Sequence, residues 1–182
     1  MLTACSKKGD NTNTTATTAS RTPATTEKVT NEPAEGRDVG NKYIDIALPG
    51  LQGNPVKLSD YVPKNKYTLV DFWASWCGPC RAEMHNVVQA YTEFHDKGLE
   101  VVGVSLDKDH DAWVQGVSEL KMPWPQMSDL NGWECAGAVT YNIRSIPANI
   151  LINQQGIIIA KDLRGVELLD KMAELMNNTT EQ

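Results

Sequence analysis

The segment from residue 67 to residue 73 restricts the fold of this chain more than any other. It reads YTLVDFW and is nearly all apolar, with β-branched and aromatic residues on both faces. A strand of this kind lies buried on both sides, as in a sheet covered by helices. Residues 78–97 follow as a helix that ends at Gly98, and residues 99–104 form a second buried strand. Strand, long helix and strand make a βαβ unit, so these two strands are expected to be parallel.

Shorter patterns on either side complete the prediction. Residues 43–48 alternate like an edge strand, and residues 109–120 are expected to form a helix. Residues 148–152 and 157–160 flank Asn-Gln-Gln-Gly and predict a β-hairpin, and residues 166–176 predict a closing helix. The sequence therefore predicts an α/β fold with a central mixed sheet, in which a βαβ unit is followed by a hairpin and a helix.

The motif Cys77-Gly78-Pro79-Cys80 lies between the first buried strand and the long helix. Unpaired amides and the helix dipole favour negative charge at a helix N-terminus, which lowers the pKa of a thiol there from about 8.5 towards 7. Cys77 is therefore expected to be the exposed nucleophile of a redox pair. Cys80, one turn into the helix, is placed to attack the mixed disulfide and release the product. Pro79 suits the first turn, where its missing N–H is not needed.

Two other roles compete for this cysteine pair. Zinc binding needs a second pair of ligands, and the remaining candidates form no such pair at the spacing of a zinc knuckle. Those candidates are Cys135, His85, His95 and His110. A static structural disulfide is disfavoured by the position between strand and helix. We therefore predict redox chemistry with no metal and no cofactor beyond the redox-active disulfide Cys77–Cys80.

Three segments of the chain resemble the thioredoxin-like superfamily. Residues 70–81, VDFWASWCGPCR, look like the active-site segment of thioredoxins, and residues 141–147, YNIRSIP, look like the segment that bears their cis-proline. Residues 80–84, CRAEM, further resemble the TlpA/ResA-like branch of extracytoplasmic, usually membrane-tethered thiol–disulfide oxidoreductases. That branch carries an insertion before the cis-proline, which residues 104–147 fit. The resemblance spans residues 42–176 and implies a thioredoxin-like fold with an N-terminal extension and a central insertion.

The resemblance also implies how the substrate is held. Ile146-Pro147 is expected to be a cis bond beside Cys77, and the Ile146 backbone is expected to pair with the bound substrate. An ordinary trans-proline at the start of a strand is the alternative. Substrate contacts are implied at Trp76, Gly78, Pro79, Ile146 and Pro147.

Two carboxylates complete the predicted site. Asp71 interrupts the buried strand, and a buried carboxylate without a nearby cation has a raised pKa. The matching aspartate of thioredoxins relays a proton to the resolving thiol, which makes Asp71 the candidate general base for Cys80. Glu83 matches an acidic residue of the TlpA/ResA-like branch, although a solvated glutamate paired with a nearby base fits the sequence equally well. His85, where the family usually has proline, is interpreted as a partly exposed bystander, and Cys135 as a small buried residue rather than a third redox cysteine.

Residues 1–39 differ in composition from the rest of the chain. They are rich in threonine and poor in apolar residues, so we predict a flexible linker ahead of a thioredoxin-like domain at residues 40–182. Leu2-Thr3-Ala4-Cys5 resembles a bacterial lipobox, which implies that Cys5 is a lipid anchor on the periplasmic side of a membrane. A stray cysteine near the start of the chain is the alternative.

Charge narrows the range of partners. The chain carries 17 basic and 23 acidic residues and a net charge of −6, which argues against nucleic-acid binding and against electrostatic attachment to anionic lipid. No run of about 18 apolar residues occurs, so the sequence predicts no transmembrane helix and membrane contact through the lipid anchor only.

Together these features predict a thiol–disulfide oxidoreductase that reduces disulfides of extracytoplasmic proteins. Gly-Pro between the cysteines resembles reducing thioredoxins, so we expect a potential nearer about −270 mV than −120 mV. Such an enzyme needs a membrane-embedded electron donor, and apocytochrome c is a frequent substrate of the TlpA/ResA-like branch. A peroxiredoxin-type peroxidase is one alternative, although no Pro-x-x-x-Thr-x-x-Cys pattern surrounds Cys77 or Cys135. A non-enzymatic, tethered client-binding module is the other.

Overall fold

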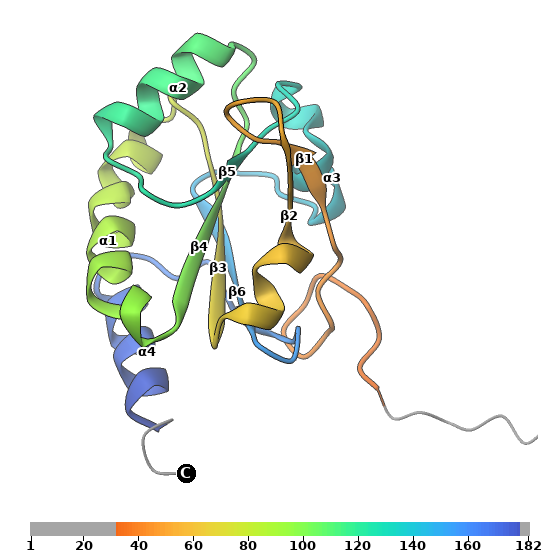
Figure 1. Ribbon diagram of the computed structural model, residues 1–182, viewed down its shortest axis with the longest axis vertical. Coiled ribbons are helices and arrows are strands. Elements are labelled where there is room, and N and C mark those ends of the chain that lie inside the picture. The colour runs from red at the N-terminus through yellow and green to blue at the C-terminus, as the bar shows by residue number, and fades with distance from the viewer. Residues whose placement is uncertain (1–31, 179–182) are drawn as a thin grey trace, which may run out of the picture. The chain divides into compact units, whose positions relative to one another are not determined.

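The computed structural model describes residues 32–178 of the 182-residue chain (Figure 1). Cys5 and most of the predicted linker therefore lie outside the described residues. Within residues 32–178, no helix is both long enough and apolar enough to cross a bilayer. The elements in chain order are β1 (Ala47–Pro49), β2 (Pro55–Lys57), η1 (Leu58–Asp60), η2 (Val62–Lys64), β3 (Tyr67–Trp73), α1 (Gly78–Phe94), η3 (His95–Lys97), β4 (Leu99–Ser105), α2 (His110–Glu119), β5 (Gln126–Met127), η4 (Gly132–Glu134), α3 (Ala136–Thr140), β6 (Ala148–Asn153), β7 (Ile158–Lys161) and α4 (Val166–Asn178).

Five strands build the main sheet in the order β5-β4-β3-β6-β7. β3 and β4 run parallel, from Tyr67 opposite Leu99 to Trp73 opposite Ser105, as expected for strands joined by α1. β6 pairs antiparallel with β3, and β7 pairs antiparallel with β6, which confirms the predicted hairpin. The sheet is therefore mixed, as predicted, and the buried strand β3 lies at its centre.

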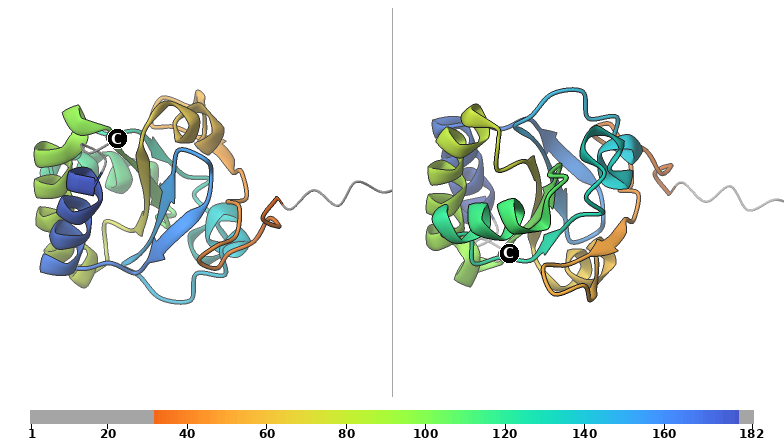
Figure 2. Two further views of the ribbon diagram at one scale, coloured as in Figure 1. Left: turned by 90° about the horizontal axis from the view of Figure 1, so that it is seen from below. Right: turned by 90° about the horizontal axis from the view of Figure 1, so that it is seen from above.

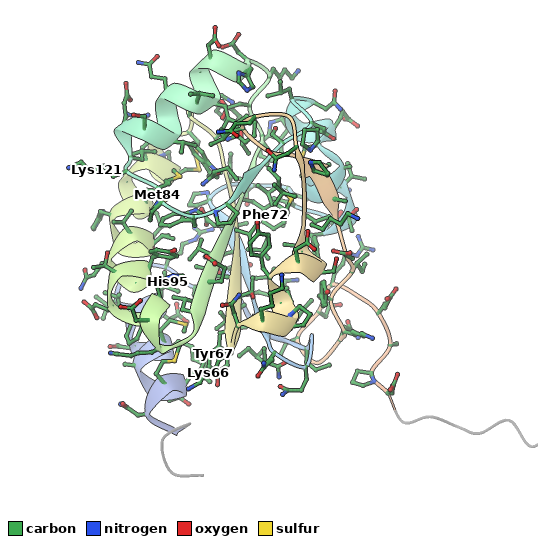
Figure 3. All side chains as sticks on the ribbon, viewed as in Figure 1. Lys66, Tyr67, Phe72, Met84, His95 and Lys121 are labelled. Atoms are coloured by element: carbon green, nitrogen blue, oxygen red, sulfur yellow. A yellow bond between two sulfur atoms is a disulfide. The ribbon has the colours of Figure 1, made fainter. Side chains whose placement is uncertain are left out.

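Helices cover the sheet on two sides. α1 and α4 pack together on one face, while α3 and the β1–β2 hairpin lie on the other (Figure 2). Side chains alternate along β3, so Asp71 and Phe72 point to opposite faces. Phe72 is labelled in Figure 3. Its ring lies 5.9 Å from the ring of Tyr141, which follows α3. Asp71 therefore faces the layer that holds α1 and α4.

The N-terminal strand is shorter than its alternating pattern predicts. The strand expected at residues 43–48 begins only at Ala47, where β1 pairs with β2. Upstream, the Tyr141 hydroxyl donates to the Ile44 carbonyl oxygen at 2.6 Å and accepts from the Ile44 N–H at 3.0 Å. A side chain thus satisfies both backbone groups of Ile44, which removes the need for a strand partner there.

The last residues of the predicted linker contact the domain. The Gly36 N–H donates to the Lys42 carbonyl oxygen at 2.9 Å, and the Lys42 N–H donates to the Ala34 carbonyl oxygen at 3.0 Å. Lys161 Nζ of β7 lies 3.4 Å from Asp38 Oδ1. This part of the linker therefore lies against the domain, and the boundary at residue 39 stays a prediction.

The insertion between β4 and the proline segment holds α2, β5 and α3. β5 has only two residues and extends the sheet beyond β4. Its Gln126 Oε1 accepts a hydrogen bond from the Trp73 indole N–H at 3.1 Å. The Gln126 side chain fills the space above Gly103 of β4, where any Cβ would collide with it. The absence of a side chain at Gly103 thus makes room for the bond that ties β5 to β3.

Replacing Gly103 by alanine is expected to destabilise the domain by about 1–3 kcal/mol, because the new methyl group must displace the buried Gln126 side chain. Urea unfolding measures the change. Gly78→Ala is the matched control, since its Cβ would meet no atom within 4 Å, and it should change stability by less than about 0.5 kcal/mol. Equal urea midpoints of unfolding for the two variants would show that the Gln126 side chain does not restrict the residue at position 103.

Candidate active site

The two cysteines of the motif form a disulfide at the start of α1. Their Cα atoms lie 5.2 Å apart, and Cys77 caps the helix from an extended conformation. Cys77 Sγ accepts a hydrogen bond from the Cys80 N–H at 3.2 Å. A backbone amide in this position stabilises an ionised sulfur more than a neutral one, so reduction of the disulfide leaves Cys77 in surroundings that favour a thiolate.

The expectation that Cys77 is exposed is wrong for the disulfide form. Cys77 is 5% exposed and Cys80 is 1% exposed. The physical reason is the proline segment, because Cys77 Sγ lies 3.8 Å from the Ile146 carbonyl oxygen. Cys77 remains the more accessible of the two cysteines.

The Ile146–Pro147 peptide bond is cis, as predicted. It directly precedes β6, which pairs with β3 so that Ala148 lies opposite Phe72. This pairing brings the proline segment next to the end of β3, where the cysteine motif begins. Ile146 is partly exposed, and no group in residues 32–178 accepts a hydrogen bond from its N–H.

Asp71 is 2% exposed, on the α1 side of β3. Burial raises the pKa of this carboxyl from 3.8 to about 7, with a further increase from the negative charge of Glu83 and an opposing effect from Arg164. The predicted increase in pKa is therefore present. No cation was predicted near Asp71, so the effect of Arg164 on this carboxyl is a finding of the structure.

Glu83 lies on α1, partly buried, and its Oε1 accepts a hydrogen bond from the Gly165 N–H at 2.7 Å. Within residues 32–178, Glu83 forms no ion pair with a basic side chain. The alternative of a solvated glutamate paired with a nearby base is therefore wrong. His85 is exposed, and its Nδ1 contacts the carbonyl oxygen of Ala82 in the same helix. The structure therefore brings Glu83 to the acid Asp71 and leaves His85 on the surface.

Sequence reasoning missed two residues near the site. Trp133 belongs to the insertion, and its ring lies 6.3 Å from the ring of Trp76, which precedes Cys77. Arg164, just before α4, donates a hydrogen bond from Nη2 to the Pro147 carbonyl oxygen. Neither residue belongs to a spacing motif, so the sequence carried no signal for them.

Cys135 is fully buried and free, and burial raises the pKa of its thiol, in agreement with the interpretation of a buried residue.

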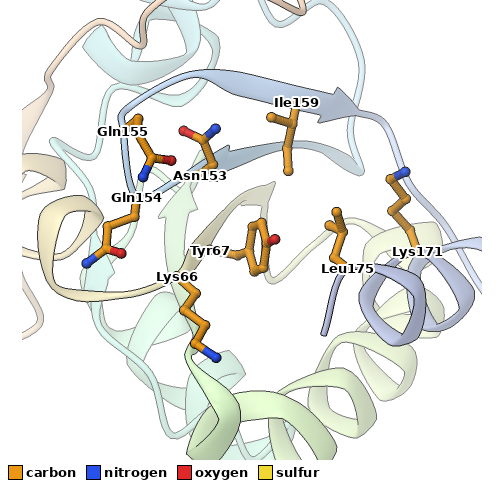
Figure 4. A pocket seen from close by; sticks show the side chains of 8 residues that line it. All are labelled: Lys66, Tyr67, Asn153, Gln154, Gln155, Ile159, Lys171 and Leu175. Carbon is orange, nitrogen blue, oxygen red and sulfur yellow. The ribbon is translucent and has the colours of Figure 1, made fainter. Parts of the chain in front are cut away.

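A pocket of about 380 Å³ lies at the end of the sheet opposite to the cysteine motif (Figure 4). Lys66, Tyr67, Asn153 and Lys171 are among the residues that line it. β3 begins and β6 ends there, whereas the cysteine motif follows the end of β3. The pocket is therefore separate from the disulfide, and none of its residues was predicted to take part in the chemistry.

A sheet of this order, with a redox-capable disulfide opening its first long helix beside a cis-proline, defines a thiol–disulfide oxidoreductase with the thioredoxin fold. The chain belongs to the AhpC/TSA family, whose model matches residues 39–161. It is 33% identical over 148 residues to the thiol-disulfide oxidoreductase ResA of Oceanobacillus iheyensis, covering 79% of this chain and 74% of that protein.

Solved structures agree with this assignment. The thioredoxin domain of a thiol-disulfide oxidoreductase from Bacteroides vulgatus matches with a TM-score of 0.70 and 34% identity, covering 76% of this chain and 98% of that chain. A thiol:disulfide interchange protein from Bacteroides sp. matches with a TM-score of 0.69 and 34% identity, covering 79% and 93%. The predicted fold and class of enzyme are confirmed.

Proposed function

We propose that this chain reduces disulfides of extracytoplasmic proteins through the Cys77/Cys80 pair. The Cys77 thiolate attacks one sulfur of the partner's disulfide, forms a mixed disulfide and releases the partner's other sulfur as a thiolate that takes up a proton. Cys80 then loses its proton and attacks Cys77 Sγ, which releases the partner's second thiol. Two electrons and two protons pass to the partner, and the enzyme is left with the Cys77–Cys80 disulfide.

The observation that carries this proposal is the hydrogen bond from the Cys80 N–H to Cys77 Sγ at the start of α1. It supplies the nucleophile with a fixed donor, and the 5.2 Å separation of the Cα atoms keeps the resolving thiol within reach. A static disulfide would not require a buried acid in the strand that precedes it. The reaction needs no cofactor beyond these two sulfurs.

Asp71 is proposed as the base that takes the proton from Cys80. A group with a pKa of about 7 can both accept and return a proton at neutral pH, which suits a step that runs in both directions. Glu83 is proposed to act through Asp71, because its negative charge raises the pKa of that carboxyl. The division of labour therefore gives proton transfer to Asp71 and adjustment of its pKa to Glu83.

The proposed partner binds as an extended segment along the cis-proline. The free N–H of Ile146 supports this, since it can donate to a backbone carbonyl of the partner as in an added β-strand. Trp76 is 57% exposed and Trp133 is 44% exposed, although large apolar side chains favour burial. The proposed contact residues are Trp76, Gly78, Pro79, Trp133, Ile146 and Pro147.

Replacing Trp133 by alanine is expected to raise the KM for a protein disulfide about tenfold, because the partner loses one face of an aromatic contact. The rate with a small disulfide such as bis(2-hydroxyethyl) disulfide should not change, since it is too small to reach Trp133. Steady-state kinetics with both substrates measures this. Val139→Ala removes another exposed apolar side chain of the insertion and should leave both rates unchanged. An equal loss with both substrates would contradict a docking role.

The location and the source of electrons are proposed from the sequence. The lipobox-like Leu2-Thr3-Ala4-Cys5, which lies outside the described residues, supports a lipid anchor at Cys5. The anchor would hold the protein on the periplasmic side of a bacterial membrane. The electrons then come from a membrane-embedded donor, because the surrounding compartment is oxidising. Apocytochrome c, with its paired thiols, is the proposed class of partner.

A two-electron potential tests the direction of the reaction. The protein is equilibrated in thiol–disulfide buffers and its free thiols are counted at each ratio. We expect a potential nearer about −270 mV than −120 mV. A value near −120 mV would make the protein an oxidant. Consumption of hydrogen peroxide by the reduced protein, with no transfer to protein disulfides, would favour the peroxidase alternative.

A further inference from the structure

The loop that joins β7 to α4, residues 162–165, contacts both sides of the site. The Gly165 N–H donates to Glu83 Oε1 at 2.7 Å, and Arg164 Nη2 donates to the Pro147 carbonyl oxygen. One residue of the loop therefore holds the acidic side of the site, and its neighbour holds the segment on which the partner is proposed to bind.

The loop is itself fixed to the strand next to Asp71. The Leu163 N–H donates to Asn149 Oδ1 at 3.0 Å, and Asn149 Nδ2 donates to the Leu163 carbonyl oxygen at 2.7 Å. Asn149 is 2% exposed and lies directly opposite Asp71 in the β3–β6 register. This buried pair of hydrogen bonds sets the position of the residue that follows, Arg164.

Arg164 also brings a charge to the buried acid. Two charged side chains act on Asp71, namely Glu83 from α1 and Arg164 from the loop, and they act in opposite directions. The neighbours of Asp71 on the adjoining strands, Gly103 and Asn149, are uncharged. Arg164 is therefore the one cation, among residues 32–178, that offsets Glu83 at this carboxyl.

We propose that Arg164 is a positioning residue, whose guanidinium holds the Pro147 carbonyl for the incoming partner and counters the negative charge of Glu83 at Asp71. The proposal rests on the proposed reduction cycle. It joins two requirements of the cycle, since one side chain fixes the docking segment and also favours the ionised form of the base. A guanidinium suits both tasks because it is always charged and offers several donors.

Arg164→Met removes the charge and the donors while keeping most of the side-chain length. We expect the KM for a protein disulfide to rise about tenfold through loss of the bond to Pro147. The pH at which the rate of the resolving step is half-maximal, its pH midpoint, should move up by about half a unit because the positive charge is lost. Arg164→Lys should restore the pH midpoint, because it restores the charge. Stopped-flow tryptophan fluorescence from pH 5 to 9 follows the resolving step.

Arg144→Met is the matched control. Arg144 is an exposed arginine three residues before Pro147. Among the described residues, its side chain donates a hydrogen bond only to Asn142 Oδ1. It should keep the wild-type KM and pH midpoint. If wild-type protein turns over and Arg164→Met matches Arg144→Met in both measurements, the role of Arg164 is refuted while the cycle stands. If reduced wild-type protein does not reduce a protein disulfide, the cycle itself is refuted.

Discussion

Replacing Cys77 by serine is expected to slow the reduction of a protein disulfide by at least about 10³-fold, to the rate without enzyme. The serine hydroxyl does not ionise near neutral pH, so the amide of Cys80 has no anion to stabilise. Insulin reduction, followed by turbidity with dithiothreitol as the electron source, measures the loss. Serine differs from cysteine only in having oxygen in place of sulfur and is a favoured N-cap residue, so the substitution should leave the fold unchanged.

Two further cysteine variants separate the steps of the cycle. Cys80→Ser keeps the nucleophile and removes the thiol that resolves the mixed disulfide, so it should accumulate a covalent complex with the partner through Cys77. Cys135→Ser should keep at least half of the wild-type rate, because Cys135 is fully buried and free. Activity that survives Cys77→Ser and disappears in Cys135→Ser would move the chemistry to a different sulfur.

Replacing Asp71 by asparagine is expected to slow the resolving step by about 10²-fold, because a positioned base contributes about 10²–10⁴-fold to a proton transfer. The rise in rate across the pKa of about 7 should vanish as well. Rapid mixing of reduced enzyme with a peptide disulfide at pH 5 to 9 separates attack by Cys77 from resolution by Cys80. If the rate of resolution by Cys80 keeps its wild-type pH midpoint in Asp71→Asn, the base is a group other than Asp71.

The same substitution should change how stability depends on pH. The folded state holds a proton on Asp71 up to about pH 7, whereas the unfolded chain loses it near the ordinary value of 3.8. The native state thus binds more protons between these values, and its stability falls as the pH rises through that window, by up to about 4 kcal/mol. Asp71→Asn removes this loss and should be the more stable protein at pH 8.

Urea unfolding at pH 5 and pH 8 compares the two proteins. Asp170→Asn, an exposed carboxyl on α4, should keep the wild-type dependence of stability on pH. A wild-type protein that gains stability from pH 5 to pH 8, with Asp71→Asn behaving alike, would show that the Asp71 carboxyl is not held in its neutral form by burial.

The local part of the fold followed from the sequence. The apolar runs of β3 and β4 and the long helix between them determine a parallel pair, and the turn residues after β6 determine the hairpin. The disulfide and the cis-proline were predicted from two short motifs, residues 77–80 and 141–147, and from the resemblance of each motif to the thioredoxin-like superfamily. These features depend on neighbours in sequence, which a pattern can record.

The remainder depends on contacts between distant residues. β1 starts late because Tyr141, 97 residues away, takes both backbone groups of Ile44. Cys77 is buried because the Ile146 carbonyl, 69 residues later, lies against its sulfur. Arg164 contacts the Pro147 carbonyl, 17 residues away, because β6 and β7 pair and bring the following loop back to the proline segment. No spacing rule describes such contacts, which is why the burial of the nucleophile Cys77 and the cation that acts on Asp71 were not predicted.

Counting thiols in a single turnover tests whether the Cys77/Cys80 pair passes its two electrons to a partner. Fully reduced protein is mixed with one equivalent of a protein that has a single disulfide, quenched with an alkylating reagent under unfolding conditions, and analysed by mass spectrometry. We predict that Cys77 and Cys80 lose their thiols together, that Cys135 keeps its thiol, and that the partner gains two thiols. Retention of both thiols at Cys77 and Cys80 beside an intact partner disulfide would contradict it.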